Sequence, residues 1–260
     1  MEVIVQRDYE QMSKTAAHVV AELLNTKPNA VLGMATGSTP LGLYQELVRL
    51  HKKEQLDFSR VTTFNLDEYV GLPVNHPQSY HFFMHEHFFR HVNIPPQNIN
   101  IPSGTTSNYP AFCAWYEKRI TECGGIDLQI LGIGTDGHIA FNEPTSSLSS
   151  RTRLKTLSKQ TIDDNARFFD RREDVPVYAI TMGVGTILDA RQLLLVASGT
   201  AKSKAIAQAV EGPVTSMVTA SALQLHRDAT VIVDEEAAGG LMMRDYYEFI
   251  YAAKPAAPRA

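Results

Sequence analysis

The sequence predicts an α/β fold, in which helices cover both faces of a mostly parallel sheet. Short apolar runs alternate with segments whose apolar residues recur at helical spacing, over most of the chain. No internal repeat, low-complexity tract or Gly/Ser-rich linker interrupts the 260 residues. Strands that alternate with helices in this way form parallel sheets covered on both faces, so we expect one domain over residues 1–260.

The first half of the chain alternates strands and helices from residue 9 onward. Met12, Ala16, Val19 and Leu23 fall on one face of the first helix, and Pro40 suits the first turn of the second. Predicted strands span 30–35 and 61–65; predicted helices span 9–25, the segment after Pro40, 79–91 with Ser79 as N-cap, and 109–122.

The second half continues this alternation. Predicted strands span 126–133, 152–157, 176–181, 192–198 and 229–233, and predicted helices span 183–189, 201–211 and 235–251. Ligands of open parallel sheets bind beyond the carboxyl ends of the strands. Three polar, glycine-containing loops follow predicted strands, at 36–40, 65–71 and 134–144. We therefore expect these loops to form one shared site.

Composition and charge exclude several classes of partner. The formal net charge is −4, so nothing indicates a nucleic-acid partner. No apolar run approaches the roughly 20 residues of a membrane span, and the N-terminal residues lack the features of a signal peptide. The two cysteines, Cys113 and Cys123, are too far apart along one predicted helix to form a disulfide. We expect a cytoplasmic protein with free thiols.

The loop at 36–40 has the features of an anion site. A strand, a tight turn and a new helix follow one another, and Gly37 allows the backbone to approach a ligand closely. Thr36, Ser38 and Thr39 add hydroxyl groups. Neither a Walker loop nor a dinucleotide fingerprint is present. A simple strand-to-helix turn is the equally weighted alternative at this point.

Two adjacent acids, Asp67 and Glu68, follow the strand at 61–65. Adjacent side chains at a strand end do not easily face the same point, so we expect one carboxylate in the pocket and the other in a structural role. A carboxylate in a partly desolvated pocket has a raised pKa, as a general base requires. A solvated acidic turn is the alternative.

The segment GTDGHIAFNEP places Asp136, His138 and Glu143 within eight positions. Of the three, only His138 has an unperturbed pKa near neutrality. Two neighbouring acids would hold such a base in one orientation. A metal site with one histidine and two carboxylates is an alternative, and a purely structural loop is another.

A second candidate metal site is the histidine-rich segment SYHFFMHEHFFRH. His81 and His85, and likewise His87 and His91, are spaced four residues apart on a predicted helix. The zinc-protease pattern HExxH is absent, because Phe89 occupies the position of its second histidine. An amphipathic helix with a polar histidine face is the preferred interpretation.

Several long motifs together resemble those of glucosamine-6-phosphate deaminases. The resemblance extends over almost the whole chain, except for about the last 20 residues. The motifs are TGSTP at 36–40, FNLDEYVGL at 64–72, HPQSY at 76–80, GIGTDGHIAFNEP at 132–144, SRTRLKTL at 150–157, ARFF at 166–169, VEG at 210–212 and LQLH at 223–226. The resemblance implies a three-layer α/β/α sandwich of the sugar-phosphate isomerase type. It also implies conversion of glucosamine 6-phosphate and water to fructose 6-phosphate and ammonia, without a cofactor or catalytic metal.

The resemblance also implies a role for each candidate residue. His138 would open the sugar ring, with Asp136 and Glu143 holding it, and Asp67 would move the proton between C2 and C1. The phosphate would bind Thr36, Gly37, Ser38 and Thr39, with Arg167 and Lys202 neutralising it. Lys204 is the alternative to Lys202. Ser38 replaces a glycine found in many relatives, but its backbone N–H is retained.

The resemblance leaves regulation and assembly open. Ser146, Arg153 and Lys155 match residue types of a site for the effector N-acetylglucosamine 6-phosphate in some relatives. Other relatives with similar residues are unregulated monomers, so the sequence does not decide between a monomer and a homo-oligomer. The segment at about 157–180 is expected to be a mobile lid. Two rival functions are a 6-phosphogluconolactonase of the same fold and a non-catalytic sugar-phosphate sensor, which would need a DNA-binding extension.

Overall fold

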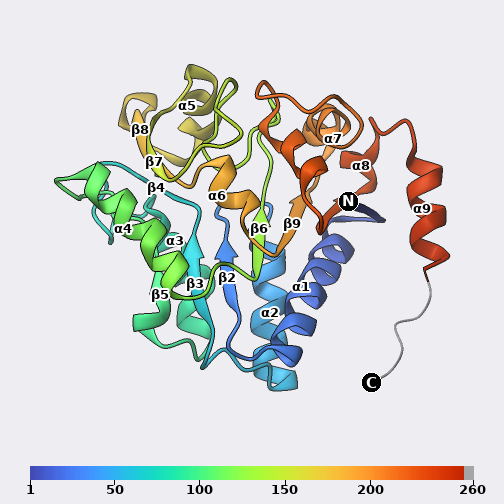
Figure 1. The fold of residues 1–260 in the computed structure, drawn as a ribbon, viewed down its shortest axis with the longest axis horizontal. Coiled ribbons are helices and arrows are strands. Elements are labelled where there is room, and N and C mark those ends of the chain that lie inside the picture. The colour runs from blue at the N-terminus through green and yellow to red at the C-terminus, as the bar shows by residue number, and fades with distance from the viewer. Residues whose placement is uncertain (255–260) are drawn as a thin grey trace.

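A seven-stranded parallel sheet forms the centre of the molecule (Figure 1). The computed structural model describes residues 1–254. In spatial order the strands are β1 (Glu2–Gln6), β10 (Ala229–Asp234), β9 (Gln192–Ala197), β6 (Leu128–Leu131), β2 (Val31–Met34), β3 (Thr62–Asn65) and β5 (Ile99–Asn100). Helices flank this sheet, and the predicted α/β sandwich is confirmed.

The order of the strands places a ligand site between β2 and β6. From β2 the chain adds β3 and β5 on one side, and it then returns to the other side of β2 to add β6, β9 and β10. A doubly wound sheet binds its ligands where the direction of strand addition reverses. The loops that follow β2 and β6 are 36–40 and 132–144, two segments that the sequence predicts to lie in the site.

The helices agree with the predicted segments in position, with several shorter than expected, except for α5, which lies in the segment predicted to be a lid. Gly239 and Gly240 interrupt the predicted helix 235–251 and divide it in two, because glycine is unfavourable within helices. Predicted segment 79–91 is an α-helix followed by a 3₁₀ turn. The helices are α1 (Tyr9–Thr26), α2 (Leu41–Glu54), α3 (Tyr80–His87), α4 (Tyr109–Glu122), α5 (Lys159–Asn165), α6 (Val184–Leu188), α7 (Ser203–Val210), α8 (Glu235–Ala238) and α9 (Arg244–Ala252). None in residues 1–254 is both long and apolar enough to cross a membrane.

A second, antiparallel sheet departs from the predicted parallel pattern. Its three strands are β4 (Asp67–Tyr69), β8 (Tyr178–Thr181) and β7 (Arg153–Thr156), with β8 in the middle. Two segments predicted as strands, 152–157 and 176–181, therefore pair with each other and leave the main sheet. β4 lies in a segment that the sequence predicts to be a loop. This small sheet lies with α5 beyond the carboxyl ends of β2, β3 and β6 (Figure 1).

Gly104 packs so closely against β4 that a side chain there would displace the strand. A Cβ atom at Gly104 would collide with the carbonyl oxygen of Tyr69. A backbone atom cannot move aside as easily as the end of a flexible side chain. We expect Gly104→Ala to lower the free energy of unfolding in urea by about 1–3 kcal/mol. Gly132→Ala is the matched control, because a Cβ there meets no atom within 4 Å. Equal stability of the two variants would contradict this packing.

Candidate active site

A cavity of about 350 Å³ lies at the predicted site, over the carboxyl ends of β2 and β6. Six separate parts of the chain contribute to its wall: the loop after β2, the start of β4, the first turn of α3, the loop after β6, the α5 region, and the turn after β9. Among the residues predicted from sequence, the lining includes Thr36, Gly37, Ser38, Thr39, Asp67, His138, Arg167 and Lys202. Residues up to 166 positions apart are thus brought together, from Thr36 to Lys202.

The loop after β2 presents unpaired backbone donors to this cavity. Gly37 has a φ of 105°, a conformation that favours glycine. The backbone N–H groups of Gly37, Ser38 and Thr39 donate to no acceptor within residues 1–254. They lie at the N-terminal end of α2, where the helix dipole adds positive potential. This arrangement can bind an anion such as a phosphate.

Tyr9 fixes the conformation of this loop from α1. Its hydroxyl lies 3.2 Å from the Ser38 carbonyl oxygen and 3.1 Å from that of Thr39. The same hydroxyl accepts a hydrogen bond of 2.7 Å from the Gly42 N–H in the first turn of α2. The Ser38 and Thr39 carbonyls are therefore turned toward α1, and their N–H groups stay available to the cavity.

Two cationic side chains line the same cavity. Lys202 lies in a 3₁₀ turn ahead of α7, and its Nζ donates to the Ile133 carbonyl oxygen at 2.7 Å. Burial, with a further contribution from the Arg167 charge, lowers the pKa of Lys202. Arg167 lies 4.7 Å from the ring centroid of Phe168. Lys204 is exposed and does not line the cavity, so the geometry favours Lys202 of the two lysines considered.

Asp67 is the carboxylate that faces the cavity from β4. Its side chain is 6 % exposed, and burial, followed by the charge of Glu68, raises the pKa of Asp67 to about 8. Successive residues of a strand point to opposite faces. Glu68 accordingly does not line the cavity, and it accepts hydrogen bonds from the first turn of α3. Of the two adjacent acids, Asp67 thus lines the cavity and Glu68 is buried outside it.

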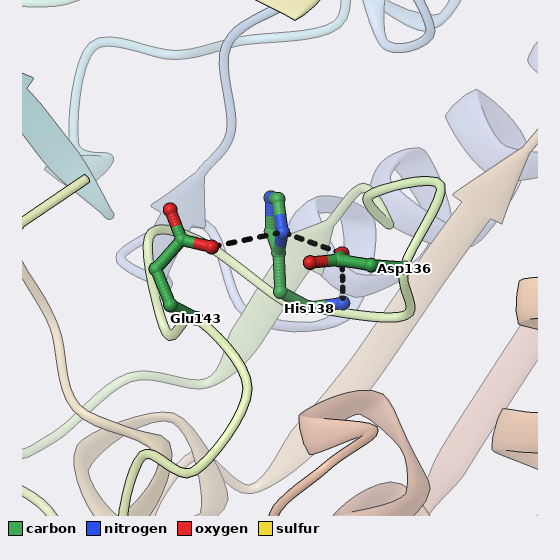
Figure 2. A group of neighbouring side chains, drawn as sticks. All are labelled: Asp136, His138 and Glu143. Carbon is green, nitrogen blue, oxygen red and sulfur yellow. Dashed lines mark hydrogen bonds and ion pairs between the residues drawn. The ribbon is translucent and has the colours of Figure 1, made fainter. Parts of the chain in front are cut away.

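His138 lines the cavity, and the other two residues of its loop lie behind it. Figure 2 shows Asp136 and Glu143 on opposite sides of the imidazole. His138 Nδ1 is 2.7 Å from Asp136 Oδ1 and 3.9 Å from Glu143 Oε2. The contact between His138 Nδ1 and Asp136 is short enough for an ion pair. Its angle is too far from linear for a hydrogen bond. Neither acid lines the cavity.

The contacts of Asp136 keep this acid ionised and orient the imidazole. Burial alone would raise the pKa of Asp136, but its hydrogen bonds and charge interaction with His138 lower it overall. Asp136 also accepts a 3.1 Å hydrogen bond from the His138 backbone N–H. A carboxylate beside Nδ1 favours the proton on that nitrogen, which leaves Nε2 free to accept a proton.

Close backbone packing holds the loop around His138. The imidazole lies directly on Gly134, where a Cβ atom would overlap the ring. Asn142 donates to the carbonyl oxygens of Ile139 and Met182, and Thr219 bonds to both ends of the Ile139–Asn142 turn. Glu143 is 5 % exposed and accepts a hydrogen bond from the Ser158 N–H at 2.9 Å. His138 is therefore held from several sides.

Known proteins resemble this chain over almost its whole length. The family model described as glucosamine-6-phosphate isomerases/6-phosphogluconolactonase matches residues 6–232. A glucosamine-6-phosphate deaminase of Arthrobacter sp. strain FB24 is 52% identical over 256 residues, covering 98% of each chain. One from Thermoanaerobacter sp. strain X514 is 50% identical over 248 residues, covering 95% of this chain and 98% of its own.

This chain belongs to the glucosamine-6-phosphate isomerase/6-phosphogluconolactonase family. Within that family, a solved structure described as a monomeric glucosamine-6-phosphate deaminase matches with a TM-score of 0.91 and 46% identity, covering 92% of this chain and all of its own. The 6-phosphogluconolactonase of Trypanosoma brucei matches with a TM-score of 0.73 and 19% identity, over 92% and 98% of the two chains. The second likeness establishes the fold alone.

None of the three candidate effector residues lines the cavity, and two of them lie on one face of β7. Arg153 and Lys155 are two residues apart on that strand. Burial, followed by the charge of Arg153, lowers the pKa of Lys155. Ser146 is buried, and its hydroxyl donates to the Glu143 carbonyl oxygen at 2.6 Å. The structure thus links Ser146 to the loop that carries His138.

The histidine helix does not provide a metal site. Within the described part of the chain, the group of three or more side chains close enough to hold an ion is Asp136, His138 and Glu143, whose donor atoms lie within 4.8 Å of one another. His81 instead bonds to Glu68, and His85 contacts Glu86. The sequence interpretation of an amphipathic helix α3 fits these contacts.

The sequence alone did not single out several residues of the cavity wall. Tyr80, Phe141 and Asp164 line it, and the Tyr80 ring stacks on that of Phe141 at 6.2 Å. Tyr80 is the last residue of the HPQSY motif, so this motif could have identified it as a site residue. Asp164 accepts a hydrogen bond from the Thr135 hydroxyl at 3.2 Å, which joins α5 to the loop of His138.

Proposed function

We propose that this chain is a glucosamine-6-phosphate deaminase that uses the cavity residues described above. The observation that carries the proposal is the joint lining of one cavity by an anion cradle, a lone buried carboxylate and a braced histidine. The substrate offers a phosphate, a ring oxygen and an acidic C2 proton, one for each group. Relatives that are about half identical over nearly full length carry the same name.

Ring opening is assigned to His138. The pyranose form hides the C1 carbonyl, so a proton must leave the C1 hydroxyl and another must reach the ring oxygen. Asp136 beside Nδ1 leaves Nε2 to carry that proton. Asp136 and Glu143 stabilise the positive charge that the His138 imidazole acquires, without contacting substrate.

The transfer between C2 and C1 is assigned to Asp67. Its carboxylate takes the C2 proton, and the C2–H electrons form a C1=C2 enolamine as the C1 oxygen gains a proton. Return of the proton to C1 gives an iminium at C2. Water adds to that carbon, and ammonia leaves to give the ketone. A base with a pKa near 8 is well matched to this step.

The phosphate is assigned to the loop of Thr36, Gly37, Ser38 and Thr39, with Arg167 and Lys202 as cations. We expect Lys202→Met to raise KM for glucosamine 6-phosphate about 10- to 100-fold, because a charged hydrogen bond contributes about 1.5–3 kcal/mol. The measurement is steady-state ammonia release. Lys204→Met is the matched control and should change KM less than about twofold; a larger effect of Lys204 would reverse the assignment.

The segment at about 157–180 is proposed to act as a lid within a single domain. It carries α5 and Arg167, and it lies over the cavity together with the small sheet. Its buried side chains Leu157, Ile162 and Val175 belong to a small apolar cluster that is separate from the main core. An element that packs on its own cluster can move without disturbing the main core.

Regulation by a phosphorylated sugar is proposed at Ser146, Arg153 and Lys155. Two like charges on β7 suit an anion such as N-acetylglucosamine 6-phosphate, and the Ser146 hydroxyl bonds to the Glu143 backbone. Kinetics with and without this compound, together with the mass in solution, test both the effector and the oligomeric state. An unchanged kcat/KM with no detectable binding would exclude the effector.

Ammonia release from glucosamine 6-phosphate by the purified chain is the deciding experiment. The expected products are fructose 6-phosphate and ammonia in equal amounts, with activity unchanged by a metal chelator. Hydrolysis of 6-phosphogluconolactone without ammonia release would instead support the lactonase alternative. Sugar-phosphate binding with neither reaction would support the sensor alternative.

A further inference from the structure

Glu68 is a buried carboxylate to which the proposed reaction assigns no role. Its side chain is 1 % exposed, and it follows Asp67 directly on β4. Oε1 accepts hydrogen bonds of 2.9 Å from the backbone N–H groups of Tyr69 and Tyr80. Oε2 lies 3.1 Å from the His81 N–H and 2.9 Å from His81 Nδ1. These four contacts hold the buried Glu68 carboxylate in one position.

These contacts join two elements that each contribute a side chain to the cavity wall. Asp67 enters the cavity from β4, and Tyr80 enters it from the first turn of α3. Glu68 binds the backbone of both elements. The Tyr80 ring in turn lies 5.0 Å from the Tyr69 ring and stacks on Phe141, next to the loop of His138. A shift of Glu68 therefore moves the base relative to the other catalytic groups.

The charge of Glu68 also acts on Asp67. The titratable groups around Asp67 are Glu68 and Tyr69 on β4, Tyr80 on α3 and Tyr116 on α4, with His138 across the cavity. Glu68 is the only one of these that can supply a neighbouring negative charge at neutral pH. A neighbouring anion makes Asp67 a stronger base. The N-terminus of α3 and His81 offset the cost of burying the Glu68 carboxylate.

We infer that Glu68 is a positioning residue for the Asp67 base, held in place by the N-terminus of α3 and by His81. It does not touch substrate; it fixes the distance between β4 and α3 and sets the electrostatic field at Asp67. This inference rests on the proposed deaminase function.

Glu68→Gln separates the electrostatic effect on Asp67 from the positioning of β4 and α3, because it removes the charge of the side chain with little change of its shape. The carboxamide oxygen can still accept from Tyr69 and Tyr80, and the NH₂ group can donate to a His81 ring that has changed tautomer, while the bond from the His81 backbone N–H is lost. We expect kcat to fall about tenfold while KM changes less than about threefold. The acid limb of the kcat/KM profile should move to lower pH, because Asp67 loses the neighbouring anion. A purely structural residue would lower stability and leave that limb in place.

The wild-type pH profile of ammonia release is measured first, which tests the deaminase function independently. Activity in the wild type with an unmoved acid limb in Glu68→Gln would overturn the inference alone. If Glu68→Gln does not fold, His81→Ala decides, with His85→Ala on the exposed part of the same helix as the matched control. A kcat several-fold lower for His81→Ala than for His85→Ala supports the inference, and equal values overturn it.

Discussion

Asp67→Asn is expected to reduce ammonia release about a thousandfold or more while leaving phosphate binding nearly intact. Asparagine has almost the same shape as aspartate, so the buried site on β4 stays filled. The carboxamide cannot take the C2 proton, and a positioned general base contributes about 10²- to 10⁴-fold. Steady-state kinetics give the loss of turnover, and calorimetric titration with a sugar phosphate gives the retained affinity.

The wild-type enzyme should show the matching pH dependence. Burial and the Glu68 charge raise the pKa of Asp67 to about 8, so the ionised base becomes more abundant as pH rises through that value. kcat/KM in the wild type should therefore increase from pH 7 through pH 8 and level off above about pH 9. Asp164→Asn is the matched control, since this acid also lines the cavity but is assigned no proton transfer. Turnover near wild type in Asp67→Asn would refute the role of the base.

The Asp67→Asn substitution should stabilise the protein at alkaline pH. In the folded chain Asp67 has its pKa raised to about 8, against an unfolded value near 3.8. The native state therefore binds more protons between these two values, and its stability falls as pH rises from about 4 to about 8. The carboxamide of the Asp67→Asn variant carries no charge, so the variant avoids this loss. We expect its free energy of unfolding to exceed that of the wild type by a few kcal/mol at pH 9, and to equal it at pH 4, in urea titrations.

The parts of the fold predicted from sequence are those encoded locally. β2, β3, β6 and β9 are short strands that end at glycine-containing loops, β10 is a short apolar run that ends at a helix, and each was found where expected. The acid–histidine–acid loop was also accessible, because all three residues lie within eight positions of one turn. Sequence spacing is enough to place such neighbours together.

The missed parts depend on contacts between distant segments. β4 reads as a polar turn, Asp-Glu-Tyr, and becomes a strand only by pairing with β8, more than 100 residues later. The partners and the antiparallel direction of β7 and β8 cannot be inferred from their apolar residues. Likewise, no local pattern predicts that Glu68 meets the N-terminus of α3. By contrast, the Gly239-Gly240 break before α9 was readable and should have divided the predicted helix.

His138→Gln is expected to impair turnover of the cyclic substrate about 100-fold or more, since glutamine cannot carry a proton between the C1 hydroxyl and the ring oxygen. An analogue whose C5 oxygen is methylated cannot form the pyranose ring, so its deamination should be much less affected. His85→Gln, at an exposed position, is the matched control. The ratio of kcat/KM for the two substrates is the measurement. If both substrates lose activity equally, His138 acts on the C2–C1 transfer, and the assignment of ring opening to this residue is wrong.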